Sequence, residues 1–157
     1  MTSLTKNLVR GVIAGAAGTT ALNAVTYLDM AVRARPASST PQQTVERAAA
    51  LVGAPLPQDE ESKEAVESGL GSLLGILAGV GAGVVLAGVR GVTGHPRSRL
   101  GTLVTAWALA MIAGNGPMTA LGVTDPRTWA RADWTADVVP HVAYAAAAGL
   151  TLDALTD

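Results

Sequence analysis

Long stretches without a charged residue, separated by polar segments, dominate the chain. These stretches cover residues 11–28, 68–89, 100–124 and 138–152. A helix rises about 1.5 Å per residue, so about 20 apolar residues cross a hydrocarbon core of roughly 30 Å. The pattern predicts one integral membrane domain over residues 1–157, an all-α, four-helix transmembrane bundle. The predicted spans are about 6–33, 66–90, 99–116 and 136–155, and the polar connections are 34–65 and 117–135.

Glycines recur along one side of two predicted helices. The first predicted span carries Gly11, Gly15 and Gly18, and the second carries Gly71, Gly75, Gly79 and Gly83. Glycine lets two helix backbones approach closely in a membrane, and a spacing of four suits a right-handed crossing. We expect these residues to pack inside one bundle. Self-association through the same glycines and a glycine-lined pore are the alternatives.

The first polar connection contains the signals of a short amphipathic helix between helices 1 and 2. Thr40 is expected to cap its start, with Pro41 in the first turn and Gln43 completing the cap. Gly53 is expected to end it. We expect this helix to cover one end of the bundle; the alternative is that it lies along the membrane interface.

Two further signals divide the second half of the chain. The run Gly114-Asn115-Gly116-Pro117 is expected to unwind or end the third helix, because it combines two glycines with a proline. Residues 124–126 are expected to start a short helical turn. Trp129 and Trp134 follow, where an aromatic belt at the membrane interface would lie.

The composition agrees with a membrane protein and argues against several other classes. Hydrophobic residues make up 49% of the chain and charged residues 15%, while phenylalanine is absent. A net charge of −1 without a basic stripe argues against a nucleic-acid partner. The absence of cysteine excludes disulfides and thiolate chemistry. The expected partners are the lipid bilayer and either a second copy of the chain or another membrane protein.

Basic residues give the expected orientation. Lys6 and Arg10 precede the first apolar stretch, as in a signal peptide, but the helical pattern continues past any cleavage site and predicts a retained helix. Three arginines crowd the short turn at 90–99. They favour the cytoplasmic side of the plasma membrane for this turn and for both termini. Arg33 and Arg35 argue for the opposite orientation.

Polar residues near one end of the predicted bundle form the candidate polar site. Asp133, Asp137 and His141 are spaced by four and share a helix face. A carboxylate one turn before a histidine can orient the imidazole for proton relay or metal binding. The alternative is an aspartate that caps the helix start and a histidine bonded to a neighbouring helix. With the polar residues expected at the same level, the candidate site comprises Asn23, Asp29, Asn115, Asp137 and His141.

Asn115 has two interpretations of its own. Backbone groups freed by a helix break can bind a small polar ligand or ion. Asparagine and glycine also cap helix ends routinely. The polar residues as a set predict either a polar vestibule or an ordinary network of hydrogen bonds between helices.

The sequence contains no motif that predicts an enzyme. A nucleophile elbow, a phosphate-binding loop and a zinc-protease signature are all absent. The second histidine, His95, is expected on the opposite side of the membrane, so neither a metal site nor a cofactor is predicted.

Two segments resemble a known group of proteins. GVIAGAAGTTALNAVTYLDMAVRARPAS and NGPMTALGVTDPRTWARADWTADVVPHVAYAAAAG are similar to small four-helix integral membrane proteins of high-GC actinobacteria. The resemblance covers most of the chain and implies a topology, without an activity. The glycine stripes and the absence of catalytic motifs predict a non-enzymatic membrane protein that acts through helix–helix association, as a homo-oligomer or an accessory membrane subunit. The alternative is a small transporter or channel for a small polar solute, an ion or protons.

Overall fold

The chain folds into helices connected by short loops. The computed structural model describes residues 3–93 and 98–156, and His95 lies outside this part. The helices are α1 (Ser3–Arg33), α2 (Thr40–Val52), α3 (Glu60–Thr93), α4 (Arg99–Ala120) and α5 (Arg131–Ala154), with a 3₁₀ turn, η1 (Pro126–Thr128). The described residues contain no strand, so the all-α prediction is confirmed.

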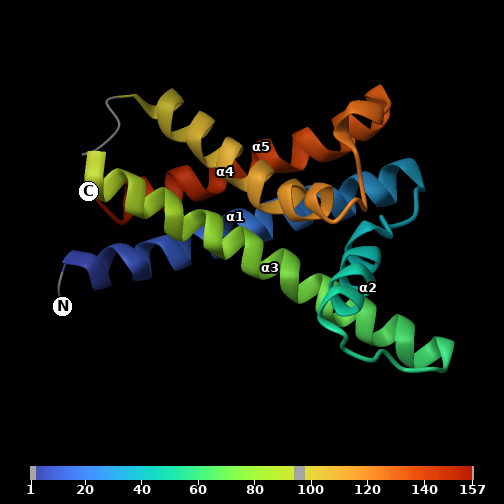
Figure 1. The fold of residues 1–157 in the computed structure, drawn as a ribbon. Helices are drawn as coiled ribbons and strands as arrows, with labels where there is room; N and C mark the ends of the chain where they lie inside the picture. The colour runs from blue at the N-terminus through green and yellow to red at the C-terminus, as the bar shows by residue number, and fades with distance from the viewer. Residues whose placement is uncertain (1–2, 94–97, 157) are drawn as a thin grey trace.

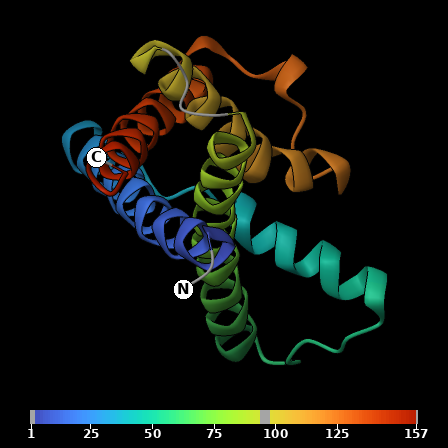
Figure 2. The same ribbon diagram turned by 90° about the vertical axis from the view of Figure 1, so that its left-hand side faces the viewer.

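Four long helices form the bundle, and α2 packs outside it. α1 packs chiefly against α3 and α5, α4 packs against α3 and α5, and α2 packs against α3. Figure 1 shows the start of α1, the end of α3, the start of α4 and the end of α5 at one end of the bundle, which we call the terminal end. The opposite end, with the α1–α2 and α4–α5 connections, is the connection end. Figure 2 views the bundle from the terminal end.

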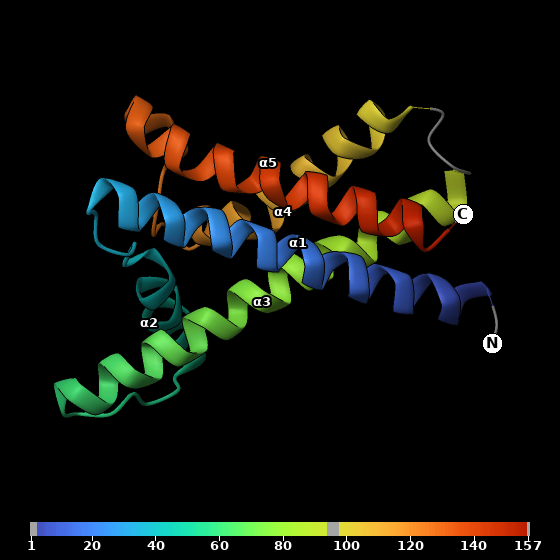
Figure 3. The same ribbon diagram turned by 180° about the vertical axis from the view of Figure 1, so that it is seen from behind.

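Glycines set the distance between α1 and α3, which cross each other in the view of Figure 3. A Cβ atom added at Gly83 would lie 2.5 Å from Gly15 N and 2.6 Å from Gly11 O, both backbone atoms. A Cβ added at Gly15 would lie 2.7 Å from Val80 Cα. No side chain fits between the two backbones here, so α1 and α3 reach this separation only because glycine lacks one.

The remaining glycines of the α3 stripe have other surroundings. A Cβ at Gly79 would meet Thr19 Oγ1 of α1, and one at Gly71 would lie 2.9 Å from Pro41 Cβ of α2. A Cβ at Gly75 would have no atom within 4 Å. Three of the four stripe glycines are therefore used for packing within this chain.

Small residues also form the interior. The two buried clusters consist mostly of alanines, together with Leu86, Leu152 and Tyr144. Large apolar side chains instead lie on the outside of all four bundle helices, and Leu77 of α3, for example, is 66% exposed. In water this distribution would leave an extensive apolar surface. It is the distribution expected where lipid surrounds the helices.

Length and composition identify two helices that could cross a membrane. Among the described residues these are Ser3–Arg33 and Glu60–Val92, with less than a third of the most apolar window buried in each. α4 and α5 do not meet the same criterion. The helical bundle is therefore confirmed, whereas four membrane crossings remain a prediction.

The predicted end of the third helix is wrong. α4 continues through Pro117 to Ala120, and Gly122, with φ of 67°, follows it. A proline inside a helix removes one backbone hydrogen bond, from its own position to the carbonyl four residues earlier. α4 packs against both α3 and α5, and Asn115, two residues before the proline, donates a hydrogen bond to Asp137 of α5.

The predicted start of the amphipathic helix is wrong by one residue. Ser39, rather than Thr40, occupies the cap position of α2, and Gln43 Nε2 donates to Ser39 Oγ at 2.9 Å. The predicted end is confirmed, because Gly53 has a left-handed φ of 66° and its N–H bonds to the last turn. Within α2, Val45 is buried and Val52 is exposed.

Gly83→Ala should destabilise the bundle by about 1–3 kcal/mol, the usual range for overpacking, because the new methyl group meets backbone atoms of α1. Thermal unfolding in detergent, followed by circular dichroism, measures this loss. Gly75→Ala is the matched control and should unfold like the wild type. Equal stability of the two variants would contradict the assigned α1–α3 contact.

Candidate functional site

Asp137 joins α5 to α4 at the centre of the candidate polar site. Asn115 Nδ2 of α4 donates to Asp137 Oδ2 at 2.9 Å. His141 Nδ1 donates to the backbone oxygen of Asp137 at 2.7 Å and lies 3.7 Å from its Oδ1. Because a carbonyl oxygen can only accept, Nδ1 carries a proton, and in the neutral imidazole Nε2 is left with its lone pair. Asn115, Asp137 and His141 are thus brought together, as predicted.

These three residues line a cavity at the connection end, which we call the charged cavity. Its volume is about 560 Å³, and its charged lining residues are Arg35, Asp133 and Asp137. Trp129, from the loop before α5, contributes an aromatic wall. The cavity is therefore built from α1, the start of α2, α4, α5 and the two connections that meet at this end.

A second cavity adjoins the first, and we call it the uncharged cavity. Its volume is about 450 Å³, and it has no Asp, Glu, Lys or Arg in its lining. Asn23 and Gly75 line it, and the missing side chain of Gly75 leaves part of its space open. The residues that line both cavities are Leu22, Thr26, Ser38, Pro41 and His141. His141 thus lies where the cavities meet, and Asn23 lies in the second one.

Asp29 does not line either cavity, but it holds a residue that does. Ala34 adopts a left-handed φ of 50° after α1, and Arg35 N donates to Met30 O at 3.2 Å. This closing turn directs Arg35 back along the helix. Arg35 Nε then donates to Asp29 Oδ2 at 2.5 Å. The predicted site residue Asp29 therefore orients a cation in the cavity wall, and it also accepts from Arg33 Nη1 at 3.4 Å.

Asp133 caps the start of α5. Its Oδ2 accepts a hydrogen bond from Ala130 N at 3.0 Å. The capping role expected for an aspartate at this helix start is therefore performed by Asp133, while Asp137 lies one turn deeper and contacts another helix.

Tyr144 separates the cavities from the alanine-rich interior towards the terminal end. Its side chain is 1% exposed, and its hydroxyl donates to Gly79 O at 2.6 Å. A Cβ at Gly18 would lie 2.6 Å from its ring, so that glycine makes room for the ring. Sequence reasoning missed Tyr144, although it is the one aromatic residue in the fourth uncharged stretch.

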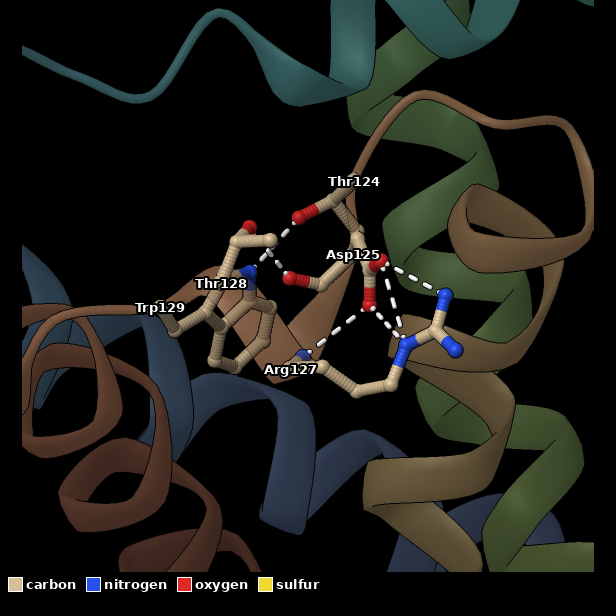
Figure 4. Close-up of polar contacts among 5 residues, drawn as sticks. All are labelled: Thr124, Asp125, Arg127, Thr128 and Trp129. Carbon is tan, nitrogen blue, oxygen red and sulfur yellow. Dashed lines mark hydrogen bonds and ion pairs between the residues drawn. The ribbon is translucent and has the colours of Figure 1, made fainter.

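The loop between α4 and α5 is held together by its own side chains (Figure 4). Asp125 accepts hydrogen bonds from Arg127 N at 3.0 Å and from Arg127 Nη2 at 2.8 Å. Thr128 Oγ1 donates to Asp125 O, and Trp129 Nε1 donates to Thr124 Oγ1 at 2.7 Å. The short turn predicted at 124–126 is confirmed by η1. This loop fixes the indole ring that walls the charged cavity.

No metal centre is assembled here. Within residues 3–93 and 98–156, no group of three His, Cys, Asp or Glu side chains could hold a metal ion.

No family model, curated protein or solved structure matches the chain.

The Asp125–Arg127 pair should make the α4–α5 loop resistant to mild acid. The hydrogen bond from Arg127 holds the pKa of Asp125 below its usual value of 3.8. Because the pKa of Asp125 is lower in the folded protein than in the unfolded chain, its pairing with Arg127 stabilises the loop above pH 3.8. The stabilisation is lost only when the pH falls through the lowered folded-state pKa of Asp125. Trp129 fluorescence should stay constant from about pH 8 to pH 5 and change below about pH 4. In Asp125→Asn that acid transition should disappear; its persistence would assign the transition to another carboxyl.

Proposed function

We propose that the chain is an integral membrane protein that binds a small polar solute in its two adjoining cavities, as a small transporter does. The observation that carries the proposal is the meeting of the charged and uncharged cavities at His141. Ionisable and amide side chains gathered inside an otherwise apolar bundle usually serve a solute or ion. The proposal requires binding and movement of a solute, and no covalent chemistry.

The surface of the bundle supports placement in a bilayer. Leucine and valine side chains cover the outside of the helices, and α1 and α3 are long enough to cross a membrane. We place the protein in the plasma membrane with four crossings and both termini on the cytoplasmic side. The cavities, at the connection end, then open towards the outside.

The absence of cysteine gives a direct test. In vesicles that contain the purified protein, Thr26→Cys should react with a small, hydrophilic, membrane-impermeant maleimide, because Thr26 lines both cavities. Leu77→Cys is the control, because this exposed position on α3 should face lipid, where a thiol does not ionise. Mass spectrometry of the labelled protein measures both rates.

Equal labelling of Thr26→Cys and Leu77→Cys would place α3 in water and contradict the membrane assignment. An unreactive Thr26→Cys in a correctly folded protein would contradict a solute-accessible cavity.

Association with a second copy is the other candidate function, and the open glycines of α3 favour it. Cβ atoms at Gly81 and Gly88 would have no atom within 4 Å. Seven positions apart, they lie on the same side of the helix, and Gly75 lies on a different side. This side remains free for close approach of another helix.

If copies associate there, Gly81→Leu combined with Gly88→Leu should reduce crosslinked dimers in lipid bilayers by roughly tenfold or more, since bulky side chains block close approach. Gly75→Leu is the matched control, because Gly75 opens into the uncharged cavity, and it should leave the dimer fraction unchanged. Unchanged dimers in both variants would contradict association through α3. A loss of dimers in Gly75→Leu alone would place the contact at the glycine stripe Gly71, Gly75, Gly79 and Gly83.

A further inference from the structure

The two cavities differ in charge in a way that indicates the chemistry of the solute. Among the described lining residues of the charged cavity, Arg35 is the one lysine or arginine, against two carboxylates, and it pairs with Asp29 at 2.5 Å. Asp29 also accepts from Arg33 Nη1 at 3.4 Å. Within the described residues, neither Asp133 nor Asp137 forms an ion pair with a lysine or arginine, and Asp137 contacts His141. The lining is therefore negative overall while His141 is neutral.

Each of these two carboxylates retains an oxygen for a ligand. Asp133 uses Oδ2 to cap α5, and Asp137 uses Oδ2 to accept from Asn115. Their Oδ1 atoms accept no hydrogen bond from residues of the described part of the chain. Both side chains come from one face of α5 and line one cavity, so a single cation can lie close to both.

Trp129 lines the same cavity and favours an organic cation over a metal ion. The hydrogen bond to Thr124 and the edge contact with Trp134, at a centroid distance of 5.0 Å, hold its ring in place. An indole attracts a cation over its face, and alkylated ammonium groups exploit this contact. A small metal ion would instead need several converging oxygen ligands, and no such group is found in the described residues.

The uncharged cavity suits the rest of such a solute. It joins the charged cavity at His141 and combines apolar side chains, such as Met30 and Ile76, with uncharged polar ones. We infer that the protein binds a small organic ammonium cation, with its ammonium group in the charged cavity and its neutral part reaching past His141. This inference rests on the proposed function.

Choline, a matched neutral alcohol and a matched zwitterion test the inference. Purified protein in nanodiscs is titrated by calorimetry with choline, with 3,3-dimethylbutan-1-ol, in which carbon replaces nitrogen, and with glycine betaine. Choline should bind at least about tenfold more tightly than the neutral alcohol, because only choline interacts with the carboxylates. Asp137→Asn should weaken choline binding by at least about tenfold.

Two further comparisons separate charge from folding. Asp137→Asn can still accept from Asn115, and Asp137→Glu, which keeps the charge, should restore most of the affinity. Glu64→Gln removes the same charge from an exposed position outside both cavities and should bind choline like the wild type. Trp129→Leu should weaken binding by about three- to thirtyfold, and Trp129→Phe by less.

The outcomes distinguish this inference from the proposed function. Equal binding of choline and the neutral alcohol, or unchanged binding by Asp137→Asn, overturns the cation assignment. If glycine betaine binds more tightly than choline, the cation assignment is overturned, and the solute is a zwitterion whose carboxylate contacts Arg35. Absence of binding by all three compounds, with a reactive Thr26→Cys, overturns the inference and leaves the solute cavity standing. An unreactive Thr26→Cys overturns both.

Discussion

The close approach of the α1 and α3 backbones is the contact on which the rest of the structure depends. Gly11 and Gly15 face Gly83 so tightly that a single methyl group would meet backbone atoms. In the proposed bilayer setting, helices gain little from apolar burial against one another, so dispersion between closely packed backbones supplies much of their attraction. This contact fixes the crossing of the two helices, and α5 then packs along α1.

The same crossing explains why the two cavities lie at the connection end of the bundle. Towards the terminal end, alanines close the interior, and Arg90 pairs with Asp153 at 2.7 Å between α3 and α5. Towards the connection end, α3 runs beside α2 (Figure 1). Gly75 of α3 lines the uncharged cavity there, and an added Cβ would have no atom within 4 Å. Side chains of α4 and α5 reach into this cavity. A glycine thus has two effects on one helix, close packing at Gly83 and open space at Gly75.

Sequence reasoning succeeded where local pattern determines structure. Uncharged stretches located the long helices, the i, i+4 spacing placed Asp137 beside His141, and Gly53 marked a helix end. It failed at Pro117, because packing against two neighbouring helices outweighed a local helix-breaking signal. The role of Arg35 was also out of reach, since it depends on a left-handed alanine that no residue preference indicates. Contacts between distant segments, such as Tyr144 with Gly79, leave no signal in a single sequence.

For the proposed transport function, the position of Tyr144 favours a carrier over an open channel. A channel needs a continuous polar path, whereas Tyr144 lies buried between the cavities and the alanine-rich interior and bonds to Gly79 of another helix. Passage of a solute through the bundle would require α5 to move relative to α3 and to break this hydrogen bond. Gly18 of α1 lies against the ring and presents no side chain to it. The solute would then be bound on one side of Tyr144 and released on the other. This is an alternating-access mechanism, in contrast to free diffusion through a pore.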